Sequence, residues 1–314
     1  MDPLDFTGRA VVVTGGTRGI GAAIAAAFQA AGADVLICGR TPPDPAPSAV
    51  TPTATPSASA VPPVAAAPSA SGSSVAGSSA SASRPPVFFQ ADVRDPAQAA
   101  ALINAAIDRF GRVDVLVNNA GGSPEVPAGS ASPRLHAKII ELNLIAPLHV
   151  AQAANAVMRE QSTGGVILMI GSVSGTRPSP GTAAYGAAKA GLHHLATSLA
   201  AEWAPRVRVN TLVVGPVEAA PMSRPGPSGF AASGPAATGA HGGRAGAGGP
   251  AASTVARTVP MGRPAAAGEV ASACLLLASP LAGYISGASL AVHGGGEWPA
   301  YLADLRDTAY RADK

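Results

Sequence analysis

Short apolar runs alternate with alanine-rich stretches of helical length along most of this chain. The runs are rich in valine and isoleucine and are apolar at consecutive positions, as expected of strands that are covered on both faces. Strands that alternate with helices predict a parallel sheet whose crossover helices lie on both sides. The sequence therefore predicts a doubly wound α/β fold of about seven strands. The predicted strands are residues 9–14, 34–38, 87–90, 113–117, 166–170, 207–213 and 289–292, and the predicted helices are residues 20–31, 96–110, 135–158, 183–203 and 268–278.

Two segments interrupt this alternation. Residues 42–86 hold 12 Ala, 11 Pro and 11 Ser, and proline at this density excludes regular helices and sheets. Residues 223–256 hold 10 Ala, 9 Gly and 4 Pro. The composition of the first segment predicts a disordered insert, and that of the second predicts a mobile lid. About 235 of the 314 residues remain outside them, so the sequence predicts a single domain over residues 1–314.

Charge and cysteine content exclude several classes of protein. The formal net charge is +3 without a basic cluster, which argues against nucleic-acid binding. The sequence contains no run of about 18 apolar residues, so no membrane span is predicted. Residues 1–8 lack the basic and apolar parts of a secretory signal. Cys38 and Cys274 are too few for a disulfide framework or a zinc ribbon, and no metal site is predicted. We therefore expect a cytoplasmic protein.

A glycine-rich turn follows the first predicted strand and opens the first predicted helix. It reads Thr14-Gly15-Gly16-Thr17-Arg18-Gly19-Ile20-Gly21. Glycines let the backbone turn tightly and approach a pyrophosphate, to which the helix N-terminus offers unpaired N–H groups. The alternative is an ordinary turn in a glycine-rich chain. The position between strand and helix favours nucleotide binding.

Three further motifs follow in order along the chain. Asn118-Asn119-Ala120-Gly121 follows the fourth strand, Ser172 follows the fifth, and Tyr185 and Lys189 form Y-x-x-x-K, with Tyr185 13 residues after Ser172. With the glycine turn, these motifs resemble the short-chain dehydrogenase/reductase family over residues 6–296, apart from the two inserts. The resemblance implies a Rossmann-type domain and an oxidoreductase with a nicotinamide cofactor. The chain is also similar to bacterial members likened to 3-oxoacyl-thioester reductases.

The resemblance implies a set of cofactor-binding residues. They are Gly15, Thr17, Arg18, Gly19, Ile20 and Gly21 in the turn, Asp92 and Val93 after the third strand, Asn119, Ala120 and Gly121 after the fourth, Tyr185 and Lys189, and Gly215 and Val217 after the sixth. A competing interpretation makes Asp92 the N-cap of the following helix.

The end of the second strand bears on the choice of cofactor. It reads Cys38-Gly39-Arg40, without the acid that binds the ribose hydroxyls in NAD-preferring members. Arg40, together with Arg18, is suited to grip a 2′-phosphate. The sequence therefore favours NADP(H), with NAD(H) as the second choice. The alternative is that Arg40 only begins the exposed insert.

Tyr185 and Lys189 share one face of a predicted helix. A free tyrosine has a pKa near ~10, which a lysine cation and a positive nicotinamide ring would lower. Tyr185 is then the candidate for moving a proton to or from a substrate oxygen, which Ser172 would hold by a hydrogen bond. By resemblance, Asn143 holds a water in a proton relay behind Lys189. Its alternative role is to cap a local bend of the helix.

The segment after the sixth strand departs from the family pattern. Val214 stands where proline is common, and Ala219 or Ala220 where a threonine bonds the carboxamide. One hydroxyl contact, worth about 1 kcal/mol, is therefore in doubt, although the Val217 backbone could still meet the carboxamide. His193 and His194 lack metal-ligand partners and are expected to be solvated or interfacial.

Several functions remain open at this point. The first is a carbonyl reductase or alcohol dehydrogenase acting on a small molecule, and the second an enoyl reductase or dehydratase on the same scaffold. The third is a nicotinamide-binding sensor or partner module without turnover. The small residues of 183–201 favour close packing against a second copy, so a dimer or tetramer is expected.

Overall fold

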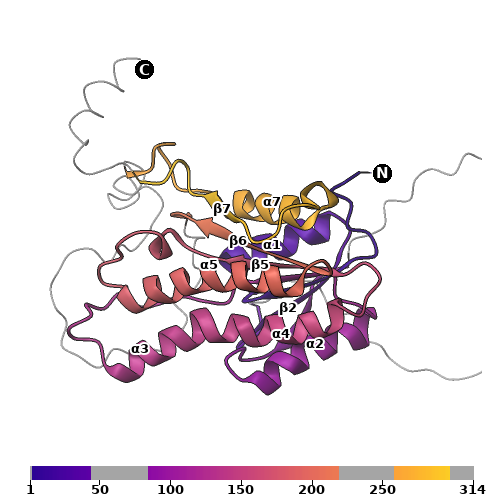
Figure 1. The fold of residues 1–314 in the computed structure, drawn as a ribbon, viewed down its shortest axis with the longest axis horizontal. Helices are drawn as coiled ribbons and strands as arrows, with labels where there is room; N and C mark the ends of the chain where they lie inside the picture. Colours follow the sequence, from indigo (N-terminus) through magenta and orange to yellow (C-terminus); the bar gives the residue numbers. More distant parts are fainter. Residues whose placement is uncertain (1, 44–83, 219–257, 298–314) are drawn as a thin grey trace, which may run out of the picture.

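The computed structural model of the chain describes residues 2–43, 84–218 and 258–297. These residues form one sheet of seven parallel strands in the order β3-β2-β1-β4-β5-β6-β7 (Figure 1). The doubly wound fold predicted from the sequence is therefore confirmed. The strands are β1 (Ala10–Thr14), β2 (Asp34–Gly39), β3 (Val87–Gln90), β4 (Val115–Asn118), β5 (Gly165–Ile170), β6 (Val207–Val214) and β7 (Ser289–Val292).

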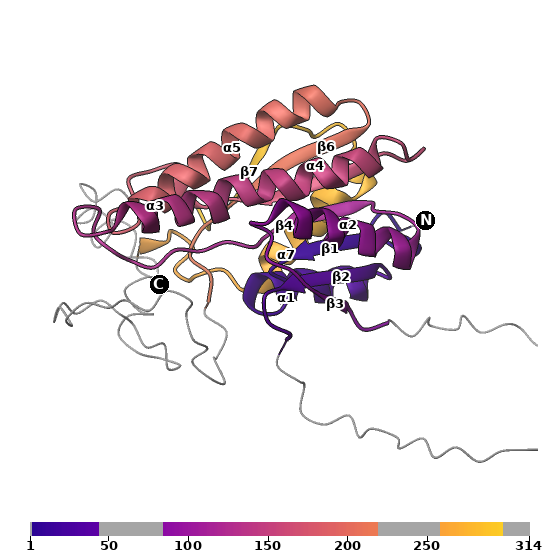
Figure 2. The same cartoon turned by 90° about the horizontal axis from the view of Figure 1, so that it is seen from below.

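Helices cover both faces of the sheet. On one face α1 and α7 pack together, and on the other α2, α4 and α5 lie over the strands, as Figures 1 and 2 show. Each face buries its own apolar core, with Phe28 and Cys274 in one and Met158 and Leu192 in the other. The helices are α1 (Gly19–Ala30), α2 (Pro96–Phe110), α3 (Pro133–Ile140), α4 (Ala146–Met158), α5 (Ala183–Trp203) and α7 (Ala267–Ala278).

The strand order reverses direction between β1 and β4. From this pair the chain proceeds outward to β2 and β3 on one side and to β5, β6 and β7 on the other. In open α/β sheets, ligands bind in the crevice outside the carboxyl ends of the strands at this switch point. The segments that follow β1 and β4 are the glycine turn and the loop that begins at Asn119.

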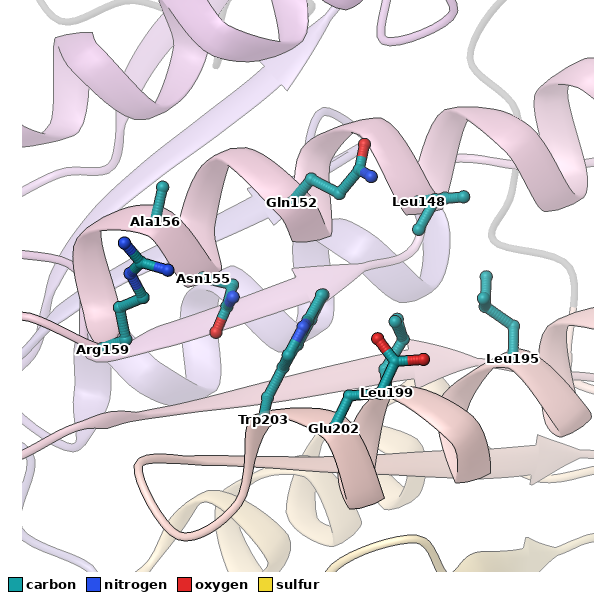
Figure 3. Close-up of a pocket in the computed structure, with 9 residues that line it drawn as sticks. All are labelled: Leu148, Gln152, Asn155, Ala156, Arg159, Leu195, Leu199, Glu202 and Trp203. Carbon is teal, nitrogen blue, oxygen red and sulfur yellow. The ribbon is translucent and has the colours of Figure 1, made fainter.

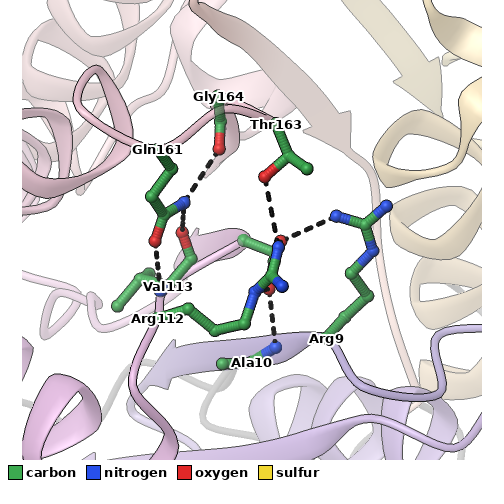
Figure 4. A network of polar contacts seen from close by, with 8 residues as sticks. Arg9, Ala10, Arg112, Val113, Gln161, Thr163 and Gly164 are labelled. Carbon is green, nitrogen blue, oxygen red and sulfur yellow. Dashed lines mark hydrogen bonds and ion pairs between the residues drawn. The ribbon is translucent and has the colours of Figure 1, made fainter.

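A polar network, drawn in Figure 4, links the strands at the end of the sheet opposite the switch point. The buried Asp114 carboxylate accepts from Arg9 Nη1 at 2.9 Å, from Arg112 Nε at 2.7 Å and from the Ala10 amide at 2.9 Å. The Gln161 side chain bonds both backbone groups of Val113. Because these contacts lie where β1, β4 and β5 begin, they fix the strands at the end of the sheet away from the switch point.

The helix predicted over residues 135–158 is divided by a wider turn. A π-helical segment (Glu141–Ile145) separates α3 from α4, and the Ala146 amide donates to the Glu141 carbonyl five residues earlier. Pro147 gives a physical reason, because it has no N–H for the carbonyl of Asn143 four residues before it. The Asn143 side chain further supports the bend by donating from Nδ2 to the Ile139 carbonyl at 2.9 Å.

The two predicted inserts lie almost entirely outside the described residues, which omit 44–83 and 219–257. Within the described residues, no helix is long and apolar enough to cross a membrane. Cys38 and Cys274 are buried free thiols, and burial raises the pKa of Cys38 to about 11. Each packs in the apolar core on one face of the sheet.

Candidate active site

The glycine turn joins β1 to α1 by a backbone path that side chains would obstruct. Gly19 has a φ of 56°, in the left-handed region that favours glycine. A Cβ atom on Gly21 would lie 2.2 Å from the carbonyl oxygen of Gly15. The turn therefore requires its glycines for close backbone packing, and it leaves open space beside Gly19.

The N-terminus of α1 is free to bind an anion. Its N-cap residue, Arg18, makes no side-chain cap hydrogen bond, and its first turn contains no acidic residue. The first N–H groups of a helix lack partners within the helix, and together with the helix dipole they favour negative charge. This open glycine cradle at an uncapped helix end fits the pyrophosphate of a dinucleotide.

The loop after β4 is fastened to the glycine turn. Thr14 Oγ1 accepts from the amides of Asn119 and Ala120, both at 3.0 Å. Asn119 Nδ2 donates in return to the carbonyls of Thr14 and Gly15, at 2.9 and 3.1 Å. The two motifs predicted to bind the cofactor are thus held together across the switch point. Thr14 is the residue that joins them, a task that we did not predict for it.

Four residues at the end of β2 and in the turn form the edge expected to meet the adenosine. Arg18 and Arg40 are both exposed. A Cβ on Gly39 would lie 3.1 Å from Thr17 Cγ2, so the turn packs closely against the end of β2. Within the described ranges, neither guanidinium forms an ion pair.

The residues after β3 only partly follow the expectation. Asp92 accepts from Arg94 Nε at 2.9 Å, and this bond, helped by the charge of Arg40, lowers the pKa of the Asp92 carboxyl. The alternative that Asp92 caps α2 is wrong, because Asp95 is the N-cap and accepts from the amide of Ala97. The side chain of Val93 is buried in the core, so only its backbone could face a nucleotide.

Ser172, Tyr185 and Lys189 meet at the carboxyl end of β5. Lys189 is 4% exposed, and its Nζ donates to the Ile170 carbonyl at 2.7 Å. The same Nζ lies 5.6 Å from the centroid of the Tyr185 ring. A side-chain hydrogen bond also joins Ser172 to the Tyr185 phenol. The three residues singled out by the motifs therefore lie together in the structure.

Burial shifts the pKa values of both Tyr185 and Lys189. Burial raises the pKa of Tyr185 above its ordinary value, and the hydrogen bond from Ser172 offsets this only in part. Burial lowers the pKa of Lys189 to about 8. Within the protein itself, loss of water around the phenol outweighs the interactions that stabilise its anion. The lowering expected from the nicotinamide ring stays a prediction.

Asn143 is fully buried beside Lys189. Its Oδ1 accepts from the Gly122 amide and its Nδ2 donates to the Gly122 carbonyl, both at 2.9 Å. A Cβ on Gly121 would lie 2.8 Å from Asn143 Oδ1 and 3.4 Å from Lys189 Nζ, so Gly121 separates the two groups. The side chain stabilises the helical bend, as the alternative interpretation predicted, and it also anchors the loop after β4.

The segment after β6 pairs with the chain that precedes α7. The Ala265 amide donates to the Pro216 carbonyl, and the Ala265 carbonyl accepts from the Glu218 amide, each at 2.9 Å. Val217 lies between them, and this bridge leaves its own N–H and carbonyl facing the other way. A Cβ on Gly215 would lie 2.8 Å from His293, which explains the glycine there. Ala219 and Ala220 lie outside the described residues.

His193 makes a contact beside the site that was not predicted from the sequence. His193 is not simply solvated or interfacial, because its Nε2 accepts from the Ser172 amide at 3.3 Å. His194, its neighbour, is exposed. The missed signal is the spacing, since His193 follows Lys189 by four residues and so lies on the same helix face.

Comparison with known proteins decides the family. A family profile described as short chain dehydrogenase matches residues 9–62 and 64–228, and one described as enoyl-(acyl carrier protein) reductase matches residues 230–297. The chain belongs to the short-chain dehydrogenase/reductase family. As a member of that family it is an oxidoreductase, and the family uses nicotinamide cofactors and small-molecule substrates.

Individual relatives span the whole dehydrogenase/reductase domain. An uncharacterized oxidoreductase of Mycobacterium tuberculosis is 30% identical over 95% of this chain and 96% of its own length. The 3-oxoacyl-[acyl-carrier-protein] reductase of Escherichia coli is 32% identical over 93% of this chain and 98% of its own. The crystal structure of gox2181 is similar with a TM-score of 0.67, at 26% identity, over 93% of this chain and 97% of that one.

Proposed function

We propose that this short-chain dehydrogenase/reductase interconverts a carbonyl group and a secondary alcohol with NADP(H). The observation that carries the proposal is the meeting of Ser172, Tyr185 and Lys189 at the carboxyl end of β5. This group is next to Gly121, in the loop that Thr14 fastens to the glycine turn. A proton-transferring group and a nucleotide cradle therefore share one crevice.

Tyr185 is the proposed general acid. Because burial raises its pKa, the phenol keeps its proton at neutral pH and can give it to the oxygen of a bound carbonyl group. We assign to the Ser172 hydroxyl the task of donating a hydrogen bond to the same oxygen. When bound, the nicotinamide supplies a hydride to the carbon of that group, or accepts one from it. In the direction of alcohol oxidation, Tyr185 takes the proton back.

Lys189 is proposed to stabilise the phenolate that proton transfer leaves on Tyr185. With a pKa of about 8, Lys189 is still mostly cationic at neutral pH. Because it is buried, its positive charge interacts more strongly with a phenolate than it would in water. We assign Asn143 to the proton relay behind Lys189, through its backbone carbonyl. That carbonyl is four residues before Pro147, which has no N–H to offer it. The side chain of Asn143 is occupied by Gly122 and Ile139, so it anchors the loop after β4 and stabilises the bend.

The preference for NADP(H) is proposed from charge at the adenosine edge. Arg18 and Arg40 are exposed there without ion pairs in the described residues. Gly39, at the end of β2, places no acidic side chain there that would repel a phosphate. Two guanidinium groups can pair with a 2′-phosphate, and NAD(H) lacks this phosphate.

Arg40→Ala is expected to weaken NADPH binding by about 10–100-fold, since a charge-assisted hydrogen bond contributes about 1.5–3 kcal/mol. NADH binding should change by about twofold or less. Fluorescence titration of both nucleotides measures this, with Arg109→Ala at the exposed end of α2 as the matched control. An equal loss of affinity for NADPH and NADH in Arg40→Ala would contradict the assignment of Arg40 to the 2′-phosphate.

The substrate class is tested by following NADPH consumption with three kinds of acceptor: simple ketones, 3-oxoacyl thioesters and enoyl thioesters. The proposal expects consumption with one or both carbonyl classes. The reductase of Escherichia coli named above is the relative that suggests the thioester. Consumption with the enoyl thioester alone would reject carbonyl reduction in favour of the enoyl-reductase alternative.

We also infer that the chain forms a dimer or tetramer through α4 and α5. These helices border a groove of about 550 Å³, and Figure 3 shows Asn155 and Gln152 from α4 opposite Trp203 and Leu199 from α5. The buried Asn155 Oδ1 has no partner among the described residues.

A cytoplasmic location stays a prediction.

Light scattering on the full chain is expected to give two or four times the monomer mass of 30.5 kDa. Leu195→Glu in the groove should reduce the mass to that of the monomer, because a buried unpaired carboxylate opposes association. Leu4→Glu, a change at an exposed leucine before β1, should leave the mass unchanged. A wild-type protein that is already monomeric would contradict the inference.

A further inference from the structure

One face of α5 holds the end of β5 at two points. Lys189 Nζ donates to the carbonyl of Ile170, and one helical turn later His193 Nε2 accepts from the amide of Ser172. The residue between these two anchored groups is Gly171. Lys189 and His193 therefore fix the backbone on both sides of the position from which Ser172 projects.

The imidazole of His193 fits closely beneath this loop. A Cβ on Gly171 would lie 2.4 Å from His193 Nε2, and a Cβ on Gly175 would lie 2.8 Å from His193 Cε1. A Cβ on Gly175 would also lie 2.7 Å from backbone atoms of Lys189 and Ala190, so α5 itself requires that glycine. Gly171 must be a glycine for the ring to reach the Ser172 amide. A solvated histidine at this position would impose no such requirement.

We propose that His193 is a positioning residue, whose neutral imidazole holds the backbone of Ser172 so that the serine hydroxyl faces Tyr185. The proposal rests on the proposed carbonyl–alcohol chemistry, which gives Ser172 its task. It adds a dependence on acid pH, since an imidazolium has N–H on both nitrogens and cannot accept from an amide. The tautomer that accepts at Nε2 carries its proton on Nδ1.

The surroundings of His193 favour the neutral form. Its pKa lies below the ordinary value of 6.5, first because the ring is partly buried and second because the Lys189 cation lies on the same helix. The loop above it offers the amide and hydroxyl of Ser172, and β6 offers the neutral Thr211, whose methyl group also lies near Gly171. Among the described residues, Lys189 is the one charged group that acts on His193.

The sign of the pH effect follows from this lowered pKa. The Ser172 contact is fully present above the ordinary histidine pKa and is lost as the pH falls through the lower pKa of the folded chain. The wild-type kcat should therefore decline on the acid side with one ionisation below pH ~6.5. The KM for the nucleotide should stay nearly constant, because the contact orients Ser172 and not the cofactor.

Two replacements separate positioning from simple packing. His193→Gln offers a side-chain carbonyl near the position of Nε2 that does not titrate, and it should keep kcat within about threefold while the acid decline disappears. His193→Leu offers no acceptor and should lower kcat by about 5–10-fold across the pH range, again without the acid decline. His194→Gln, at the exposed neighbour, should reproduce the wild-type profile.

A second readout does not depend on turnover. In the NMR spectrum of the full-length protein, the Ser172 amide signal and the His193 ring signals should titrate with one shared midpoint, and the Ser172 titration should vanish in His193→Gln. Shared titration in a protein that reduces no carbonyl would support the contact and reject the proposed function. An acid decline that survives unchanged in both His193 variants, or a Ser172 amide that ignores the His193 midpoint, would overturn the positioning role.

Discussion

Tyr185→Phe is expected to lower kcat for carbonyl reduction by about 10³-fold, while the Kd for NADPH changes by about twofold or less. The change removes one oxygen atom, the proposed proton donor, and leaves the ring that packs near Lys189. Turnover with a carbonyl substrate and fluorescence titration of NADPH measure the two effects on the same preparations.

The matched control for this change is Tyr284→Phe. Tyr284 is fully exposed on the loop before β7, so the same loss of an oxygen there should affect neither quantity. A Tyr185→Phe variant that retains a tenth or more of the wild-type kcat would show that another group moves the proton. A wild-type protein that binds NADPH but reduces no carbonyl compound would instead favour the nicotinamide-binding module without turnover.

The raised pKa of Tyr185 also predicts the direction of its pH dependence. Carbonyl reduction needs the protonated phenol, which persists through neutral pH because burial holds the pKa above its ordinary value. Alcohol oxidation needs the phenolate. We therefore expect oxidation to accelerate as the pH rises above neutral, while reduction declines only at alkaline pH.

Lys189→Met is expected to produce the second large effect, on activity and on the pH dependence of stability together. Methionine has a similar length and no charge, so it fills the space of the buried lysine. Without the ammonium group the phenolate of Tyr185 loses its stabilising charge, and kcat should fall by about 10²-fold or more. Turnover at saturating NADPH measures this loss.

The stability effect follows from the lowered pKa of Lys189. Its pKa is about 8 in the folded chain and 10.5 for the free group. A lowered pKa contributes stability that is present above the unfolded value and is lost as the pH falls through the folded one. The wild-type free energy of unfolding should therefore drop by about 3 kcal/mol between pH 10.5 and pH 8, relative to Lys189→Met.

Denaturant unfolding at a series of pH values measures the difference between the two proteins, which cancels the titration of groups that they share. Lys138→Met on α3 provides the control, and it should keep the wild-type pH dependence because Lys138 is not buried. Parallel pH profiles for wild type and Lys189→Met would show that the lysine is hydrated in solution, which would remove the basis for its proposed charge effect.

The sequence predicts the architecture because the features that determine it are local. Continuous apolar runs, helical spacing and glycines at the first turn recur in the structure with bounds that differ by a residue or two. The motif order also located Ser172, Tyr185 and Lys189, because parallel strands bring their carboxyl ends to one edge. The architecture follows from spacing along the chain, whereas the three site residues follow from the resemblance of their motifs to the family.

What the sequence did not predict depends on side-chain directions and on contacts that form only in the folded chain. The division of the helix at Asn143 needs both Pro147 and the loop at Gly122. The binding of Asp92 by Arg94 and the contact of His193 with Ser172 arise from side-chain directions that spacing does not specify. The raised pKa of Tyr185 reflects burial, which is a property of the assembled fold.

The central claim is that the glycine turn and its neighbours bind a nicotinamide nucleotide with a 2′-phosphate. Titration of the full-length wild-type protein with NADPH and with NADH, followed by nucleotide fluorescence, tests this most directly. We expect saturable binding of NADPH at one site per chain, tighter than that of NADH. Binding of neither nucleotide would contradict it.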